Sequence, residues 1–389
     1  MIKAIRNGKV FLPAATLQEV TVLISGDSIS GVGVEGQGLE VPPGAAILDA
    51  RGKTVMPGLI DLHTHLTIYQ DPALLGAGEG RAVLRGAHLA FQALRAGITA
   101  MRDMGGYHHV DIDLRNAIDE GLILGPKLLC AGKVIATTGG HIYYVAREAD
   151  GPYEVRKAAR EQLKAGADFI KVMCSGGVER ASESEDAVQL TYDELCAAVE
   201  VARDAGRIVA AHVHPARAMK EAVKAGAGSI EHGSFLDSEC ADLMAEKGCF
   251  LVPTFSVYAF LASIGPTDLR ERAKRVSDRK YESFRLAVNR GVPWGVGTDS
   301  GAFSPMKSLI DEIIMTAETG ISNVEILRHA TAENAKLVGL TNTGSLAQGK
   351  KADIILVDGD PVSKLRDLDR VTHTIRNGVI YEWATWPGA

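Results

Sequence analysis

Apolar runs and helical stretches alternate along the middle of the chain. The apolar runs, which are typical of buried strands, read ITAMRDMG, PKLLCAG, DFIKVMCSGG, RIVAAHVH, SIEHGS, CFLVPTFS and VPWGVGTDS. Residues 151–166 and 191–206 have a helical pattern, and each segment ends in a glycine, as helices often do. Repeated strand and helix predict an α/β protein whose parallel sheet closes as a (β/α)8 TIM barrel. A doubly wound open sheet is the alternative, although no G-x-G-x-x-G motif opens its first unit.

The two ends of the chain share a different pattern. Residues 1–55 and 343–389 contain short β-branched or alternating segments separated by Gly, Asn and Asp turns. The segment IRNGKVF near the start also resembles IRNGVIY near the end. Two unrelated hairpins with Asn-Gly turns would give the same pattern. We favour a single small β-sandwich domain built from both termini, with residues 56–342 as the catalytic barrel domain.

Composition and charge limit the kinds of molecule that the protein is expected to bind. The 389 residues carry a formal net charge of −6 without a run of basic residues, which argues against nucleic acid as a partner. Five cysteines form no C-x-x-C pair, so we expect reduced thiols rather than a disulfide framework. No apolar stretch is long enough for a membrane span or signal peptide. We therefore expect a cytoplasmic protein that acts on a small molecule without a membrane partner.

Ionisable side chains stand at or near the ends of five apolar runs. Each has an ordinary structural alternative, such as a loop hydrogen bond, an ammonium that reaches the surface, or a helix cap. Their joint placement in one apolar barrel mouth instead indicates a bound ion. In chain order, these residues are His63, His65, Lys171, His212, His232 and Asp299.

The types of these side chains point to particular metals. Imidazole and carboxylate ligands suit Zn²⁺, with Mn²⁺, Co²⁺ and Fe²⁺ as alternatives. His63 and His65 lie two positions apart, so a strand directs both to one face. A protonated lysine cannot be a ligand. Lys171 fits such a site only if it is modified, for instance by CO2 to a carbamate that bridges two metal ions.

Several motifs together resemble the amidohydrolase superfamily. They are VMPGLIDLHTHL, FIKVMCSGGV, AHVH, IEHGSFLD, GVGTDSG and GSLAQGKKADIILVDGDP, and they extend over essentially the whole chain. Within that superfamily, ATTGGH, GADFIKVMCSGGV and IEHGSFLD are most similar to the branch of Xaa-Pro and Xaa-Arg dipeptidases, or metallo-carboxypeptidases, and ochratoxinase-like amidases. The resemblance implies a (β/α)8 barrel, a β-sandwich made from both termini and a binuclear metal centre.

The resemblance also implies roles for the six residues. His63, His65 and Asp299 would hold the more buried metal ion, and His212 and His232 would hold the second. Carboxylated Lys171 would bridge both ions, for which zinc is the first expectation. A metal-bridging hydroxide would attack the scissile carbonyl, and Asp299 would pass its proton to the leaving amine.

Four further residues are candidates for substrate binding. His141 and Tyr143 lie in the Gly-rich segment ATTGGHIYY, which follows a predicted barrel strand. Arg180 follows Lys171 and is a candidate clamp for a carboxylate, with a solvated loop arginine as the alternative. The branch that the chain resembles usually carries a tyrosine where this chain has His214. This departure leaves recognition of a free substrate carboxylate open.

The leading prediction is a binuclear metal-dependent hydrolase that cleaves the amide bond of small peptides or N-acyl amino acids. A cyclic-amide hydrolase or a deaminase of the same superfamily is the enzymatic alternative. Lys171 and the lack of an HxxE motif beside His212 make the deaminase the weaker of these. An inactive barrel scaffold is the non-enzymatic alternative, but all six ligand positions are occupied. By resemblance, we also expect a homo-oligomer.

Overall fold

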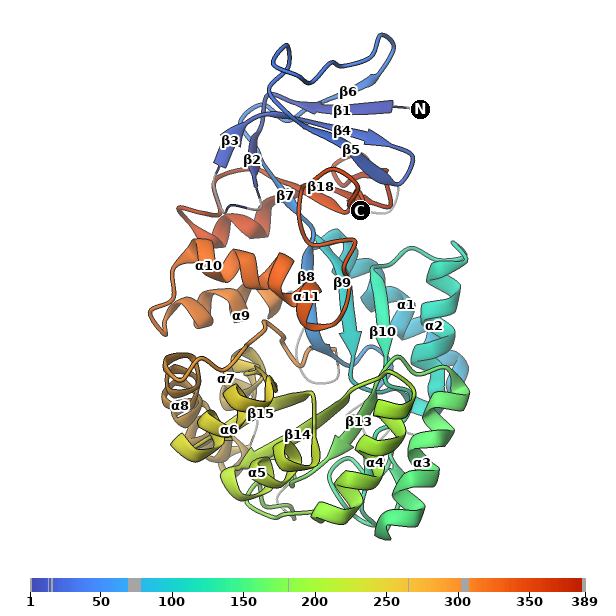
Figure 1. Ribbon diagram of the computed structural model, residues 1–389, viewed down its shortest axis with the longest axis vertical. Helices are drawn as coiled ribbons and strands as arrows, with labels where there is room; N and C mark the ends of the chain where they lie inside the picture. Colours follow the sequence, from blue (N-terminus) through green and yellow to red (C-terminus); the bar gives the residue numbers. More distant parts are fainter. Residues whose placement is uncertain are drawn as a thin grey trace. The chain divides into compact units, whose positions relative to one another are not determined.

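The computed structural model describes residues 2–12, 14, 17–68, 78–180, 182–264, 266–301 and 308–386. Contacts between residues divide the chain into two compact units. The first comprises Met1–Asp61, Ala90–Ala100 and Ile313–Ala389, and the second comprises Leu62–Leu89 and Met101–Glu312. In Figure 1 the blue and red ends of the chain belong to the first unit. Strands β8 (Leu59–Thr64) and β9 (Ile98–Asp103) and helices α1 (Glu79–Arg95) and α9 (Ser308–Ala317) contain residues of both units.

The first unit contains two β-sheets. The four-stranded sheet has the order β5-β4-β1-β6 and consists of β1 (Ile2–Arg6), β4 (Thr21–Ser25), β5 (Ser28–Gly33) and β6 (Ala46–Asp49). The six-stranded sheet has the order β19-β18-β17-β7-β2-β3. Its strands are β2 (Lys9–Phe11), β3 (Leu17–Glu19), β7 (Thr54–Pro57), β17 (Ile354–Val357), β18 (Val371–Arg376) and β19 (Val379–Glu382).

Strands from both ends of the chain meet in this six-stranded sheet. Strand β7 pairs with β2 in parallel and with β17 in antiparallel orientation. One buried apolar cluster includes Ile5 and Ile24 of the smaller sheet and Val55, Leu356 and Ile375 of the larger one. The helical segments of this unit are α10 (Asn323–Arg328), a π-helix (His329–Glu333), α11 (Asn334–Leu337) and a 3-10 helix (Leu365–Arg370).

The second unit alternates parallel strands with helices. Strands β8, β9 and β10 (Lys127–Cys130) form one sheet. The other sheet has the order β12-β11-β13-β14-β15-β16, and every pair in it is parallel. Its strands are β11 (Ile135–Ala136), β12 (Arg147–Glu148), β13 (Ile170–Met173), β14 (Val209–Pro215), β15 (Ser229–Phe235) and β16 (Phe250–Val252). The mixed α/β class that the sequence pattern predicts is confirmed.

The helices of this unit follow the strands in chain order (Figure 1). After α1, they are a 3-10 turn (Tyr107–His109), α2 (Val110–Asp119), α3 (Gly151–Ala165), α4 (Tyr192–Asp204), α5 (Ala216–Ala225), α6 (Ser238–Lys247), α7 (Phe255–Ile264) and α8 (Thr267–Asn289). The predicted helices at 151–166 and 191–206 are confirmed as α3 and α4. Gly166 ends α3 at φ 103°, in the left-handed region that glycine adopts without strain.

Strands β13, β14 and β15 of the second unit are buried along nearly their whole length, which explains their continuous apolar sequence. All residues of β13 are buried, and so are those of β14 and β15 except the last of each. Charged residues inside these strands therefore lack access to water. Lys171 on β13 and Glu231 on β15 are the clearest examples, with exposed fractions of 1% and 0%. Such groups need partners inside the protein.

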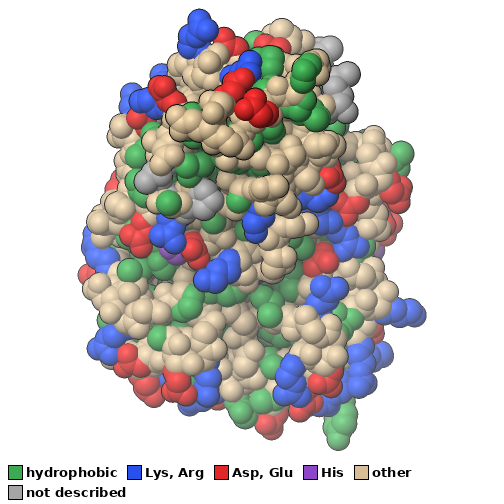
Figure 2. All heavy atoms as spheres, turned by 45° about the horizontal axis from the view of Figure 1, so that its top comes forward, with side chains coloured by type: hydrophobic (Ala, Val, Ile, Leu, Met, Phe, Trp, Pro, Cys, Tyr) green, Lys and Arg blue, Asp and Glu red, His purple; other side chains and the backbone are tan. Residues whose placement is uncertain are grey.

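The distribution of surface charges and the state of the cysteines match the expectations from the amino-acid composition. On the face shown in Figure 2, the Lys and Arg side chains are interspersed with Asp and Glu. All five cysteines are free thiols, which confirms the expectation of no disulfide framework. Within the described ranges, no helix combines the length and apolar character that a membrane crossing requires.

Candidate metal and active site

Four histidine rings lie together at the ends of three strands of the second unit. His63 belongs to β8 and His65 follows it, while His212 lies on β14 and His232 on β15. The rings of His63 and His65 are 5.5 Å apart, those of His63 and His232 are 5.0 Å apart, and those of His212 and His232 are 4.6 Å apart, measured between centroids. All four side chains are buried. The predicted convergence of these histidines is therefore present in the structure.

A buried carboxylate holds His63. Nδ1 of His63 lies 2.9 Å from Oε2 of Glu231. The other carboxylate oxygen of Glu231 accepts hydrogen bonds from Nη2 of Arg102 at 2.7 Å and from the Ser229 hydroxyl at 2.5 Å. Because the carboxylate accepts a hydrogen bond from Nδ1–H, it fixes the ring in the neutral form whose lone pair is on Nε2. That nitrogen faces Asp299.

The other three histidines are held in a similar way. One ring nitrogen of each lies near an oxygen atom, which leaves the second nitrogen directed elsewhere. The partners are the Gly105 carbonyl for Nδ1 of His65 at 3.3 Å, the Gly176 carbonyl for Nε2 of His212 at 3.4 Å, and the Thr254 hydroxyl for Nδ1 of His232 at 2.7 Å. Burial lowers the pKa of His63, His212 and His232 well below 6.5, and lowers that of His65 to about 3. Neutral imidazoles of this kind can be metal ligands.

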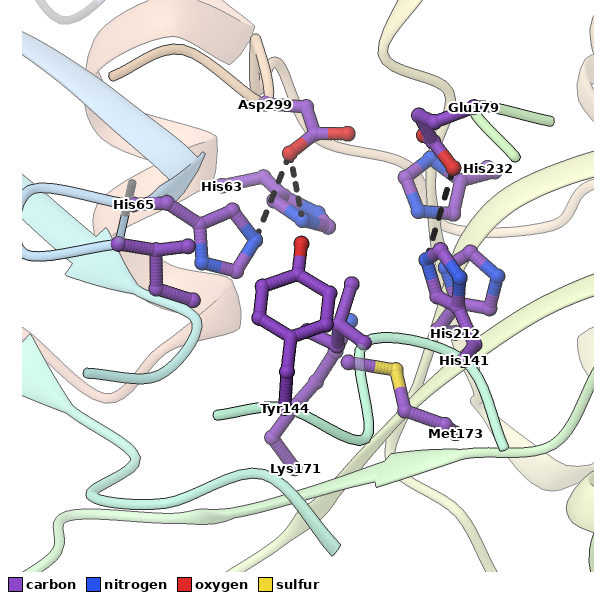
Figure 3. Close-up of a pocket in the computed structure, with 12 residues that line it drawn as sticks. His63, His65, His141, Tyr144, Lys171, Met173, Glu179, His212, His232 and Asp299 are labelled. Carbon is purple, nitrogen blue, oxygen red and sulfur yellow. Dashed lines mark ion pairs between the residues drawn. The ribbon is translucent and has the colours of Figure 1, made fainter. Parts of the chain in front are cut away.

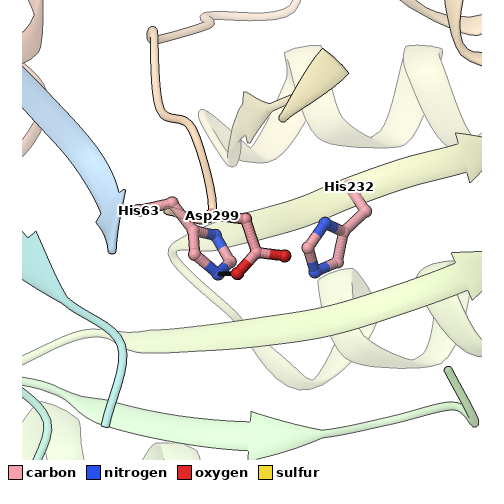
Figure 4. A group of neighbouring side chains, drawn as sticks. All are labelled: His63, His232 and Asp299. Atoms are coloured by element: carbon pink, nitrogen blue, oxygen red, sulfur yellow. Dashed lines mark ion pairs between the residues drawn. The ribbon is translucent and has the colours of Figure 1, made fainter. Parts of the chain in front are cut away.

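Asp299 completes a compact group of donor atoms. Its Oδ1 lies 3.5 Å from Nε2 of His63 and 3.4 Å from Nε2 of His65. Donor atoms of His63, His232 and Asp299 all lie within 4.8 Å of one another (Figure 4). Burial, and then the nearby Glu179 carboxylate, raises the pKa of Asp299 to about 8. A cation bound here would oppose that shift and stabilise the carboxylate.

Lys171 reaches the same group from below the histidines in the view of Figure 3. Lys171 on β13 lies opposite Ala210 of the paired strand β14, and Ala210 is two positions before His212. The side chain is 1% exposed, and Nζ has no hydrogen-bond partner within the described residues. Burial lowers the pKa of Lys171 to about 8. An unpaired amine in this position is costly unless it is modified or bound.

These side chains line a cavity whose empty space, including the part open to solvent, is about 380 Å³ (Figure 3). All six residues predicted as metal ligands line it, and so does His141. The complete lining is His63, His65, Ile68, His141, Ile142, Tyr144, Lys171, Met173, Glu179, His212, His232 and Asp299.

His141 faces this cavity between two carboxylates. Its Nδ1 lies 2.8 Å from Oε2 of Glu183, and its Nε2 lies 3.9 Å from Oε2 of Glu179. Burial lowers the pKa of His141, but the hydrogen bond to Glu183 and the charge of Glu179 outweigh it, so the pKa is raised above 6.5. The ring stacks on His212 at 4.4 Å between centroids. His141 is thus a hydrogen-bond donor at the edge of the metal group.

Comparison with known proteins decides the family. The model of the amidohydrolase family matches residues 54–381, which is most of the chain. The chain belongs to the amidohydrolase family. Ochratoxinase of Aspergillus niger is 32% identical to this amidohydrolase over 374 residues, which cover 85% of this chain and 76% of that protein.

Solved structures agree with that assignment. The crystal structure of a Xaa-Pro dipeptidase with methionine bound in its active site has a TM-score of 0.91 and 34% identity, and the match covers 98% of this amidohydrolase and 100% of that chain. The crystal structure of A. niger ochratoxinase has a TM-score of 0.87 and 29% identity, with 99% and 96% covered. The amidohydrolase is a hydrolase that acts on amide bonds.

Three of the four residues expected at the substrate, Tyr143, Arg180 and His214, are not part of the cavity lining described above, and their role in this amidohydrolase stays a prediction. Tyr143 is 42% exposed, and the neighbouring Tyr144 lines the cavity in its place, because tight turns over residues 140–146 send successive side chains in different directions. The Arg180 guanidinium stacks on the rings of both tyrosines, 5.1 and 4.4 Å from their centroids. Arg180 thus contacts a ring that lines the cavity, although it is not itself part of the lining.

His214 does not line the described cavity either. Its Nδ1 lies 2.8 Å from the Ser234 hydroxyl, and its Nε2 lies 3.3 Å from the Tyr258 hydroxyl. Because β14 alternates its side chains, His212 and His214 point to the same side, but both nitrogens of His214 are already engaged. The role of His214 in substrate binding stays a prediction, and its ring lies 4.9 Å from that of His212 and 5.2 Å from that of His232, measured between centroids.

Sequence reasoning missed several residues that support the site of this amidohydrolase. Glu231 and Arg102 form a fully buried pair, and Lys280 on α8 donates to the Thr254 hydroxyl at 2.9 Å and to the Thr254 carbonyl at 3.0 Å. A signal for the first pair was present, because both residues interrupt otherwise apolar strands, in SIEHGS and ITAMRDMG. Lys280 lies in a charged helix, so its sequence surroundings give no comparable signal.

Proposed function

We propose that this amidohydrolase is a binuclear metal-dependent hydrolase of small peptides or N-acyl amino acids. The observation that carries the proposal is Lys171, whose buried amine has no hydrogen-bond partner among the described residues and faces a group of neutral histidines and one carboxylate. Dipeptidase or carboxypeptidase activity is the specific form that we favour, because a Xaa-Pro dipeptidase and ochratoxinase are among the similar proteins.

The residues present fit two divalent ions. His63, His65 and Asp299 would hold one ion, and His212 and His232 would hold the other. Lys171, carboxylated by CO2, would bridge them, and its pKa of about 8 leaves part of the amine uncharged and reactive near neutral pH. Carboxylation also replaces a buried unpaired cation with an anion between two cations. Imidazole and carboxylate ligands make zinc our first choice.

When bound, divalent ions of this kind activate water and polarise a carbonyl oxygen. The chain's own residues would do the rest. We infer that the Asp299 carboxylate accepts the proton of the attacking water and returns it to the leaving amine nitrogen. His141 would donate a hydrogen bond from Nε2 to a substrate oxygen, since Glu183 engages its other nitrogen. The lining by Ile68, Ile142 and Met173 would limit access of further water.

We also infer that the parallel strands close into the (β/α)8 barrel. Backbone hydrogen bonds support closure, because residues 293–300 bond to β16 on one side and to β8 on the other. Further bonds from Ala131 to Asp103 and from Asp168 to Cys130 link β9, β10 and β13. Closure would bring the carboxyl ends of all strands to one mouth, where barrel enzymes carry out their chemistry. The terminal β-sandwich and a homo-oligomeric state remain predictions.

Hydrolysis of a defined panel tests the proposal. Dipeptides and N-acyl amino acids would be incubated with protein that has been stripped of metal and then reconstituted with Zn²⁺, and release of the amino acid would be measured. We expect hydrolysis by the reconstituted protein and none by the stripped protein. Lys171→Ala should abolish it, while Lys164→Ala, an exposed lysine on α3, should not. Reconstituted protein that opens a cyclic amide or deaminates a heterocycle, but leaves the whole panel intact, would contradict the proposal.

A further inference from the structure

The loop after β13 holds a carboxylate that faces the cavity without a hydrogen-bond partner. Glu179 lines the cavity, its side chain is only 13% exposed, and its Oε2 is buried with no hydrogen bond to any described residue. Figure 3 shows this carboxylate on the same side of the cavity as the rings of His141, His212 and His232. The ion pair with Nε2 of His141 at 3.9 Å leaves this oxygen without a hydrogen-bond donor, so a further cationic group is expected beside it.

The loop fixes the position of this carboxylate. The preceding residue, Val178, is fully buried in an apolar cluster with Val257 and Tyr258 of α7. Arg272 on α8 donates a hydrogen bond at 2.6 Å to the backbone carbonyl of the following residue, Arg180. The Glu179 side chain is therefore presented to the cavity from a backbone that is held on both sides.

Close packing at Gly177 adds to this restraint. A Cβ atom on Gly177 would lie 2.5 Å from Oε2 of Glu179 and 2.1 Å from Cε1 of His141, so any larger residue would displace these side chains. The Gly177 amide donates to Glu183 at 3.0 Å. This packing directs the Glu179 carboxylate and the His141 ring into the same cavity.

Neighbouring groups in the described part of the chain donate no hydrogen bond to Oε2 of Glu179. His141 is hydrogen-bonded to Glu183, and its other nitrogen is 3.9 Å from Glu179, which is too long for a hydrogen bond. The guanidinium of the adjacent Arg180 stacks on the rings of Tyr143 and Tyr144. The compact metal-binding group of His63, His232 and Asp299 does not include Glu179.

We propose that Glu179 binds an ammonium group of the substrate. This inference rests on the proposed function, and it makes Glu179 a determinant of specificity among amides. In a dipeptide, the α-ammonium is two bonds from the scissile carbonyl carbon, so it lies next to the reacting group. An N-acyl amino acid with the same scissile bond has no such charge. A lysine side chain on the leaving amino acid is the other source of an ammonium group.

Three matched substrates test this binding. Alanyl-phenylalanine and propionyl-phenylalanine share one scissile amide and differ only in the α-ammonium, while propionyl-lysine carries its ammonium on the leaving residue. Values of kcat/KM would be measured for wild type, for Glu179→Gln and for the control Asp186→Asn, which removes an exposed carboxylate from the same loop. The metal content of each variant would be measured in parallel.

We expect Glu179→Gln to lower kcat/KM about 10- to 100-fold for one of the two substrates that carry an ammonium group, alanyl-phenylalanine or propionyl-lysine. The kcat/KM for propionyl-phenylalanine should stay nearly unchanged. The affected substrate identifies whether the α-ammonium or the side-chain ammonium is bound. Equal effects on all three substrates, or a loss of metal in Glu179→Gln, would overturn the inference while leaving the proposed function intact. Failure of metal-loaded wild type on all three would contradict the proposed function and the inference with it.

Discussion

The pair between Arg102 and Glu231 provides the sharpest test of how the protein holds its metal-binding histidines. Glu231→Gln keeps the shape of the side chain but removes its negative charge. Three hydrogen bonds converge on that carboxylate, from Arg102 at 2.7 Å, Ser229 at 2.5 Å and His63 at 2.9 Å. Glutamine has a single acceptor oxygen and adds two N–H donors, so at least one buried donor would face another donor.

The magnitude follows from the burial of the pair. Both side chains are essentially inaccessible to solvent, at 1% and 0% exposed. Breaking a buried ion pair by removing one partner costs about 3–5 kcal/mol, because the guanidinium is left uncompensated. The loss of the carboxylate behind His63 should also weaken metal binding about 10- to 100-fold. The matched control is Glu239→Gln, in a surface pair with Lys220, which should cost at most about 1 kcal/mol.

Two assays separate these effects. Thermal unfolding of metal-free protein reports stability, and competition with a coloured chelator reports metal affinity. The double variant Arg102→Leu/Glu231→Leu removes both charges, so it should recover most of the stability that Glu231→Gln loses. It should recover none of the metal affinity, because His63 still lacks the carboxylate that positions it. Wild-type metal affinity in Glu231→Gln or in the double variant would refute the idea that Glu231 positions His63.

Three further changes give distinct outcomes. Lys171→Met should raise the unfolding temperature of metal-free protein, because it replaces a buried unpaired amine with an apolar chain of similar length; an unchanged or lower temperature would count against an unpaired amine. Gly177→Ala should lower kcat/KM at least about 10-fold by displacing His141, whereas Gly80→Ala, where a Cβ meets nothing within 4 Å, should have no effect; equal activities would contradict this packing. At the start of α6, burial raises the pKa of Asp237, but the hydrogen bond from the amide of Cys240 and the ammonium of Lys220 outweigh it, so the pKa is lowered. The ionised form of Asp237 therefore stabilises the protein above pH 3.8, and this contribution is lost as the pH falls through the lowered pKa. Asp237→Asn should flatten that acid-side loss in thermal unfolding, and Asp237→Ala should cost about 1 kcal/mol at pH 7; a full acid-side loss in Asp237→Asn would assign it to other groups.

The sequence allowed prediction of those features that depend on local pattern. Buried parallel strands appear as continuous apolar runs, and a glycine at the left-handed position ends α3. The strands and the end of this helix could therefore be predicted without the structure. The metal-binding candidates were readable too, because imidazole, amine and carboxylate side chains at the ends of apolar runs have few other reasons to occur together. His212 and His232 are examples, since each follows an apolar strand segment and their rings lie 4.6 Å apart.

Features that depend on side-chain direction within loops were not predictable. The choice between Tyr143 and Tyr144 depends on the turns over residues 140–146, and the position of Glu179 depends on packing of Val178 against α7. His214 follows the alternation of its strand, yet Ser234 and Tyr258, from distant segments, occupy both of its nitrogens. Local sequence contains no information about such long-range partners.

The central claim is a two-metal centre that depends on Lys171. Elemental analysis of purified wild type and Lys171→Ala, after loading with Zn²⁺ in the presence of bicarbonate and removal of free metal, tests it most directly. We predict about two tightly bound ions per chain in wild type and fewer than about one in the variant. A single ion per chain in both proteins would contradict the bridging role of Lys171 and the mechanism that rests on it.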